Sequence, residues 1–431
     1  MGHDEDETGP GSVRRTVGPV GDPDTVGWWE RLWSPFWVLP SLICAGSLLL
    51  GLLLPRIDAH LSGNLPYLFG GNADSARSLL STIASAMISV TGLVFSITMV
   101  VMQLASSQFT PRLLGQFLAS RITQVTLGVF TSSFVFSLVV LRGVRGGDSP
   151  FVPSLSVTAA FVLVLASVAL FFAFIHDITQ SIQVGQVIDR IAARTVQSLE
   201  RGKDSEWDDA SAIPPTWSQA PGPSVVVTTG EGHGTVQRIH YSHLVERASE
   251  AGVVVELRTR LGEVRHRGQS LAVVHGAHAD DDVVGEVRSA FGLGRDRTMH
   301  QDPEFGVRQL VDIAERALSP GINDPTTAVQ VLDELHRILR RAGVRADRSN
   351  YLVDGGGVVR VLDRPTTFSR LLDLALDEIA HYGADTLQVP VHIDMVLEDL
   401  ESMARQEHAA TVSAKRVDLR AQRESRSAKT G

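Results

Sequence analysis

The residues best suited to chemistry in this chain are hydroxyls set in an otherwise apolar stretch. From Ser78 to Pro111 the sequence carries no charged side chain. Small and polar residues recur there at alternating steps of four and three, with Met99 as the one apolar member, which places them on one face of a helix. We call this face the hydroxyl stripe, and its members are Ser78, Thr82, Ser85, Ser89, Gly92, Ser96 and Gln103.

A face of this kind on an apolar helix has two interpretations. In the first, the small residues let neighbouring helices approach closely, and the hydroxyls bond to carbonyls of their own helix or across the contact. In the second, copies of the helix surround a water-filled path with a neutral, hydroxylated lining. The apolar segments carry no Asp, Glu, Lys or His at mid-membrane, which disfavours a proton relay or a charge-coupled carrier but not a passive path.

A second candidate site lies in the stretch SPGINDPTTA, which begins at Ser319. Asp324 is suited to cap a helix that starts with Pro325, and capping alone accounts for most of this turn. The same carboxylate and the free amides of that helix could also hold a ligand or an arginine such as Arg308 or Arg316. The candidate ligand or inter-domain contact residues are Ser319, Pro320, Gly321, Asn323, Asp324 and Pro325.

No motif in the chain predicts an enzyme or a cofactor site. Nucleophile-elbow, Walker, dinucleotide-binding and HExxH patterns do not stand out, so we expect a protein without catalytic residues or cofactors. His233, His240 and His243 lack a standard zinc spacing, and a single cysteine, Cys44, excludes an internal disulfide. The net charge of -9 argues against nucleic-acid binding.

Four segments are long and apolar enough to be membrane-spanning helices of about 20 residues. They lie within residues 34–54, 79–104, 122–141 and 155–175. An even number of spans puts both termini on one side, and the excess of arginine on that side predicts cytoplasmic termini in a bacterial inner membrane. The predicted fold is therefore an α-helical membrane domain of four transmembrane helices followed by a soluble α+β cytoplasmic domain.

Composition and periodicity divide the chain further. Isoleucines keep a helical spacing beyond Ile175, which predicts that the fourth helix continues out of the membrane. The predicted parts are a disordered acidic leader at 1–27, a four-helix membrane domain with this helical extension at 28–201, a linker at 202–224, a small β-rich module at 225–300, a helical module with one hairpin at 301–410 and a disordered tail at 411–431.

The stretch ALSPGINDPTTAVQVLDEL, residues 317–335, resembles the signature of a bacterial family of predicted membrane proteins, domain of unknown function 2254. The run SVTGLVFSITMVVMQLASSQFTPRLL, residues 89–114, is similar to that family's second-span region. The resemblance implies a multi-pass bacterial inner-membrane protein with a soluble C-terminal region. It transfers no catalytic residue to this chain.

Two hypotheses from different classes follow. In the first, the chain forms a homo-oligomeric, channel-like path for ions or small solutes, lined by the hydroxyl stripe and gated by the soluble domain. In the alternative, it is a membrane-anchored scaffold or sensor whose soluble domain binds a protein partner or a small ligand, and the stripe only packs helices. The lipid bilayer is a partner in both. They differ in whether replacing Ser89 and Ser96 by leucine abolishes flux.

Overall fold

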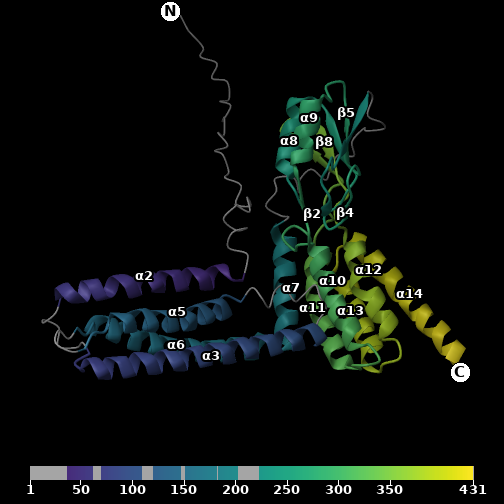
Figure 1. The fold of residues 1–431 in the computed structure, drawn as a ribbon. Helices are drawn as coiled ribbons and strands as arrows, with labels where there is room; N and C mark the ends of the chain where they lie inside the picture. Colours follow the sequence, from purple (N-terminus) through teal and green to yellow (C-terminus); the bar gives the residue numbers. More distant parts are fainter. Residues whose placement is uncertain are drawn as a thin grey trace, which may run out of the picture. The chain divides into compact units, whose positions relative to one another are not determined.

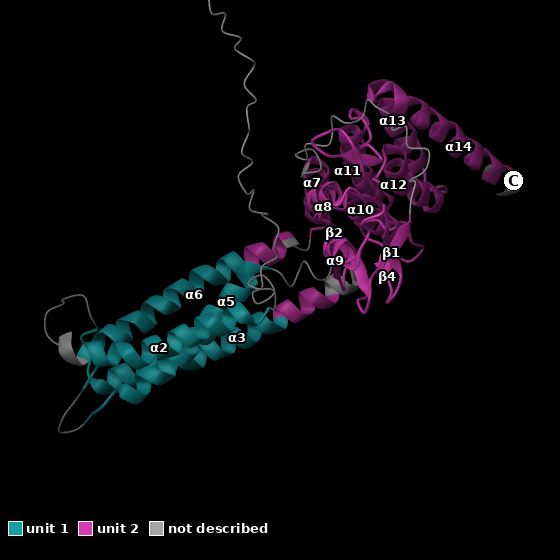
Figure 2. Cartoon of the chain, turned by 90° about the horizontal axis from the view of Figure 1, so that it is seen from above, with its two compact units in different colours: residues 1–96, 118–174 teal, residues 97–117, 175–431 magenta. Residues whose placement is uncertain are grey.

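The structure, a computed structural model, separates into two compact units that share two long helices (Figures 1 and 2). Unit 1 comprises residues 1–96 and 118–174, and unit 2 comprises residues 97–117 and 175–431. The predicted leader at 1–27 and most of the predicted linker, residues 202–222, lie outside the residues that the structure describes. The described residues are 36–61, 69–108, 120–146, 151–181, 183–201 and 223–430.

Four long helices carry the apolar half of the chain. They are α2 (Val38–Leu61), α3 (Ala73–Gln108), α5 (Arg121–Gly143) and α6 (Ser154–Ser181). Each contains a segment long and apolar enough to cross a membrane, and a domain of helices and mixed sheets follows them, which confirms the predicted fold class. Large apolar side chains such as Leu49, Phe95 and Phe172 are exposed on their outer surfaces, as expected for helices that contact lipid.

The helices α2 and α5 pack closely because glycines stand at their contact. A Cβ atom on Gly128 would lie 3.1 Å from the Cα atom of Pro40, and one on Gly51 would lie 3.1 Å from a methyl carbon of Val139. Small residues that let backbones approach are a usual basis of helix association in lipid. The sequence of this pair therefore favours direct contact between the two helices.

A buried acid joins the end of α2 to the start of α6. The carboxylate of Asp58 accepts hydrogen bonds from the backbone N–H groups of Leu155 at 2.8 Å and Ser156 at 3.0 Å, and from the Ser156 hydroxyl at 2.7 Å. The first N–H groups of a helix have no partner within the helix and carry partial positive charge. Asp58 therefore caps α6 from another helix.

Unit 2 contains a helical core. Its helices are α7 (Val184–Arg201), α10 (Pro303–Ala317), α11 (Pro325–Gly343), α12 (Phe368–Tyr382) and α13 (Gln388–Met403). The predicted boundary at residue 201 assigned α7 to the membrane domain, but the structure places its apolar face, including Ile188 and Ile191, in this core. The reason is physical: an amphipathic helix must bury its apolar stripe, and α10 and α11 supply the partner surface.

Unit 2 also contains two sheets with a second core. The larger sheet has the order β1 (Ser224–Thr228), β5 (Ser270–His275), β3 (Val254–Leu257), β8 (Val359–Leu362) and β7 (Tyr351–Val353). Its pairs are antiparallel, except that β3 and β8 run parallel. The smaller sheet has the order β4 (Val264–Arg265), β2 (Gly234–Ile239) and β6 (Phe291–Gly294). Two helices, α8 (Tyr241–Glu250) and α9 (Asp281–Ser289), pack on the strands and share their apolar core.

The predicted hairpin at residues 351–362 forms, but it belongs to the larger sheet rather than to the helical module. Strand β8 pairs with β3, where Val255 lies opposite Val361. The buried side chains of Leu352 and Val361 join the core of the sheets. The predicted division at residue 300 therefore does not separate two independent modules, because a hairpin alone has too little apolar area to be stable and must join a larger sheet.

The C-terminal segment is a helix, α14 (Gln406–Thr430), where the sequence predicted a disordered tail. Its apolar content is low, so periodicity does not reveal it. Contacts with neighbouring helices explain it: Val412 is fully buried, Lys415 lies 2.7 Å from the Asp373 carboxylate, and Arg416 lies 2.9 Å from the Asp394 carboxylate.

Candidate functional site

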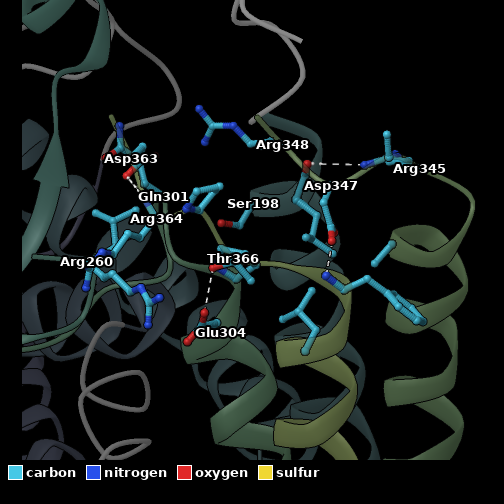
Figure 3. A pocket seen from close by; sticks show the side chains of 18 of the residues that line it. Ser198, Arg260, Gln301, Glu304, Arg345, Asp347, Arg348, Asp363, Arg364 and Thr366 are labelled. Atoms are coloured by element: carbon cyan, nitrogen blue, oxygen red, sulfur yellow. Dashed lines mark hydrogen bonds between the residues drawn. The ribbon is translucent and has the colours of Figure 1, made fainter. Parts of the chain in front are cut away.

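After β1, the chain passes between the sheets and the helical core of unit 2 three times. The crossings run from β6 to α10, from α11 to β7 and from β8 to α12. Residues of all three segments line one cavity of about 370 Å³, together with residues at the end of α7, the start of α8 and the turn after β3. We call this the crossover cavity (Figure 3).

The cavity is rich in arginine. Arg260, Arg345, Arg348 and Arg364 all line it, and in the view of Figure 3 the first and last lie on one side with Arg345 on the other. Arg345 is held by α7, since it donates a hydrogen bond of 3.4 Å to the Leu199 carbonyl. Among the described residues no carboxylate forms a salt bridge with the other three arginines, but the charges of Arg348 and Arg260 act on Asp363 and hold its pKa below the value that burial alone would give. The Nε atom of Arg260 is buried and has no hydrogen-bond partner among those residues.

Two carboxylates of the cavity wall are already engaged by the protein. Glu304 accepts hydrogen bonds from Nε of Arg370 at 2.7 Å and from the Thr366 hydroxyl at 2.8 Å. Asp347 accepts a bond of 2.7 Å from the backbone N–H of Phe368, at the start of α12. These acids therefore hold the wall together and do not neutralise the cavity arginines.

The third carboxylate forms a small network with an aromatic ring. Asp363 accepts a bond of 2.7 Å from the backbone N–H of Arg364 and is hydrogen-bonded to Tyr241. Burial raises the pKa of Asp363, while burial and the nearby Asp363 carboxylate raise the pKa of Tyr241. The Tyr241 hydroxyl therefore stays protonated at neutral pH. The guanidinium of Arg348 lies 5.2 Å from the centre of its ring, a cation–π contact.

The rest of the lining is apolar. Leu261, Pro365 and Leu371 contribute to it, and Ser198 and Gln301 add two neutral polar groups. A cavity with cationic groups and an apolar wall is suited to hold a small anion that also has an apolar body. The arrangement contains no obvious reacting pair of acid and base, since the acids are held as described above.

The sequence analysis did not predict this cavity, although one repeated dipeptide in the sequence is related to it. The dipeptide Asp-Arg occurs once in each crossing, at 296–297, 347–348 and 363–364. Two of the three arginines line the cavity, and Arg297 instead binds Asp302, which caps α10, at 2.6 Å. The repetition was visible, but only the topology shows that the three crossings meet.

The structure places the hydroxyl stripe on the exposed side of α3. All seven members are exposed, whereas the opposite face of the helix, including Leu80, Ile83 and Met87, is buried. Within the part of the chain that the structure describes, the stripe therefore does not pack against the other helices. The hydroxyls of Thr82 and Ser89 donate to carbonyls of their own helix, at 2.8 and 2.9 Å.

The turn at residues 319–325 is a helix–helix corner. Asp324 caps α11: its carboxylate accepts from the backbone N–H of Thr327 at 3.1 Å and from the Thr327 hydroxyl at 2.6 Å, and these bonds lower its pKa. Asn323 has a positive φ of 50°. The proposed contact with Arg308 does not form, because Arg308 binds Asp312 at 2.6 Å instead. The remaining predicted residues, Ser319, Pro320, Gly321 and Pro325, form this corner, in which the Ser319 hydroxyl donates to the Arg316 carbonyl at 2.7 Å.

The described residues contain no group of three or more His, Cys, Asp or Glu side chains that could hold a metal ion. The three histidines considered from the sequence, His233, His240 and His243, are not gathered into such a group. The site of interest in this chain is therefore the crossover cavity, with the stripe of α3 as a separate exposed surface.

Comparisons with known proteins identify the family. The profile of the family described as "Predicted membrane protein (DUF2254)" matches residues 33–399, as the resemblance predicted. Uncharacterized proteins of Mycobacterium bovis and Mycobacterium tuberculosis are each 31% identical over 388 residues, which cover 87% of this chain and 73% of the relative. No solved structure matches the chain. This chain therefore belongs to the DUF2254 family of predicted membrane proteins.

Proposed function

We propose that this membrane protein is a sensor whose soluble unit binds a small ligand in the crossover cavity and transmits occupancy to the membrane helices. The observation that carries the proposal is the position of α7. Ser198 and Leu199, near its end, line the cavity, and its start at Val184 closely follows α6 in the chain. One helix therefore connects the ligand site to the fourth apolar helix.

The contacts of α7 suggest how occupancy is transmitted. Arg345 of the cavity wall bonds to the Leu199 carbonyl and lies 3.7 Å from the Glu200 carboxylate. An anionic ligand in the cavity attracts Arg345, which lines the same cavity, so it weakens these two contacts and changes how the end of α7 is held. A ligand can shift an equilibrium between two arrangements by its difference in affinity for them. Binding in the cavity then favours one position of α7 over the other.

The proposal also covers the cellular location of the protein and whether it is an enzyme. We propose a multi-pass protein of the bacterial inner membrane with cytoplasmic termini, supported by the arginine excess in segments on that side. We also propose that the protein is not an enzyme. The support is that Glu304, Asp347 and Asp363 are each engaged in structural hydrogen bonds.

The single cysteine offers a test of transmission. Cys44 lies on α2, so a fluorophore attached there reports on unit 1 in the purified full-length protein. A low-molecular-weight cell extract should raise the thermal unfolding temperature of the protein and change the emission of the label. Inserting two glycines between Gln183 and Val184 should abolish the emission change and preserve the thermal shift. An extract that shifts neither signal contradicts the proposal.

A second candidate function is a channel-like path formed by several copies of the chain. The observation that favours it is the exposure of the hydroxyl stripe, which leaves this face of α3 available to other copies or to water. In liposomes, replacing Ser89 and Ser96 by leucine should abolish ion flux. The matched control replaces the exposed apolar residues Ile88 and Phe95 by leucine and should preserve flux. Equal flux from both double variants excludes a path lined by the stripe.

A further inference from the structure

We propose that the ligand of the crossover cavity is a small organic phosphate, held by Arg260, Arg348 and Arg364. This inference rests on the proposed function and names the chemical class that the cavity takes. Its first support is charge. No described carboxylate forms a salt bridge with these three guanidiniums, although three carboxylates line the same cavity and Asp363 attracts Arg260 and Arg348.

The three carboxylates of the cavity wall have other hydrogen-bond partners. Glu304 is bonded to Arg370, Asp347 to the first turn of α12, and Asp363 to a backbone N–H and to Tyr241. Each of these acids therefore has a structural role that would be lost if it turned to a cavity arginine. Asp363 offsets part of the charge of Arg260 and Arg348, and the four cavity arginines still leave net positive charge for a partner that the chain does not supply.

One donor of the cavity lacks a partner. The Nε atom of Arg260 is buried and unbonded among the described residues, and an unsatisfied buried donor is unfavourable. Arginine presents a planar fork of N–H groups that matches the oxygens of phosphate, and several such forks favour a doubly charged group over a singly charged one. The Nε atom itself is enclosed, so an oxyanion in the cavity would meet the terminal N–H groups of the Arg260 guanidinium.

Arg348 is positioned for the same group. Its guanidinium lies over the ring of Tyr241 and is hydrogen-bonded to that residue, while the nearby Asp363 carboxylate attracts it. Arg364 is exposed, so it can reach a ligand without losing a protein contact. The three cations thus differ in exposure: Arg260 and Arg348 are partly buried, and Arg364 is exposed.

The size and the apolar wall indicate an ester rather than free phosphate. The volume of about 370 Å³ is at the lower end of the range for pockets that hold organic ligands. Leu261, Pro365 and Leu371 offer apolar surface that inorganic phosphate cannot use. A phosphomonoester with a compact organic body fills both parts of the cavity.

The test measures binding to the full-length protein in detergent by isothermal calorimetry and thermal unfolding. The probes are adenosine monophosphate, glucose 6-phosphate, glycerol 3-phosphate, adenosine, inorganic phosphate and succinate, at one fixed salt concentration because such contacts are screened by salt. We expect at least one phosphomonoester to bind more tightly than inorganic phosphate, adenosine and succinate. Arg364→Gln should weaken that binding about tenfold, as should Arg260→Gln.

The matched control is Arg267→Gln. Arg267 is 69% exposed, pairs with Glu231 on the surface and lies outside the cavity, so this variant makes the same change in net charge. It should bind the phosphomonoester as the wild type does. An equal loss in the control variant, or tighter binding of succinate, would overturn the phosphate assignment.

The outcomes separate the two proposals. If cell extract stabilises the protein and Arg364→Gln removes this effect, while no phosphomonoester binds, the sensor proposal survives and the phosphate class is wrong. If neither extract nor any phosphomonoester binds, both are wrong. Arg364 is exposed, so its replacement is not expected to unfold the protein, and the unfolding temperature without ligand checks this point.

Discussion

A single methyl group at Gly306 should disturb the contact between α7 and α10. A Cβ atom at Gly306 would lie 1.9 Å from the Thr195 hydroxyl oxygen and 2.9 Å from the Thr195 Cβ atom. Rotation of the Thr195 side chain can relieve the first clash but not the second, because the Cβ atom is fixed to the backbone. Gly306→Ala therefore requires α7 and α10 to move apart.

The expected loss follows from two opposing effects. Overpacking a buried contact costs about 1–3 kcal/mol, and replacing glycine by alanine within a helix recovers up to about 1 kcal/mol. The free energy of unfolding should thus fall by about 1–2 kcal/mol. At about 2–4 °C per kcal/mol for a unit of this size, the unfolding temperature should drop by about 2–8 °C.

The assay is thermal unfolding of the full-length protein in detergent, followed by circular dichroism. The matched control is Gly285→Ala on α9, where a Cβ atom would meet nothing within 4 Å, and this variant should be as stable as the wild type or more so. The double variant Thr195→Ala with Gly306→Ala also removes the hydroxyl and methyl groups of Thr195. Its unfolding temperature should lie between those of Gly306→Ala and the wild type. An unfolding temperature of Gly306→Ala at or above that of the wild type refutes the reasoning.

Three further predictions concern other contacts. Burial and a hydrogen bond to Glu378 raise the pKa of Glu315 from 4.5 to about 7, so the native state holds a proton that the unfolded chain releases. Stability should fall by about 1–2 kcal/mol as the pH rises from about 4.5 to about 7, and Glu315→Gln should flatten this dependence in thermal unfolding at several pH values. Asp58→Ala should lower the free energy of unfolding by about 2 kcal/mol, because three donors at the start of α6 lose their acceptor. The measurement is denaturant unfolding in detergent, and a variant as stable as the wild type would count against this cap. Asn323→Val should lower the free energy of unfolding by about 1–2 kcal/mol, since a β-branched residue is strained at φ 50°. Asn323→Gly should leave it nearly unchanged. Equal unfolding temperatures for the two variants would contradict the positive φ at this position.

The sequence predicted those parts of the fold that depend on local pattern. The four apolar helices follow from length and hydropathy, and the cap at Asp324 follows from residue type and position. The contact between β3 and β8 was not predictable in the same way. Val255 and Val361 are far apart in the sequence, and no local pattern in either strand predicts which strand it pairs with.

The cavity was missed for the same reason. Its arginines come from separate segments: Arg260 from the turn after β3, and Arg348 and Arg364 from two of the crossings. Only the folded topology brings them to one place. Helix α14 was missed because ion pairs such as Lys415 with Asp373 stabilise it from outside, and these contacts leave no apolar periodicity. The exposure of the stripe also depended on which face of α3 the other helices cover.

The parallel pair of β3 and β8 has a consequence for synthesis on the ribosome. Strand β3 is made early, but its neighbour β8 appears only after α10, α11 and β7 have been translated. Throughout that interval one edge of β3 has unpaired N–H and C=O groups, and such an edge is a template for pairing with other chains. A polypeptide truncated after Gly343 keeps this edge permanently and should aggregate through it, whereas one extended beyond Leu362 supplies its own strand.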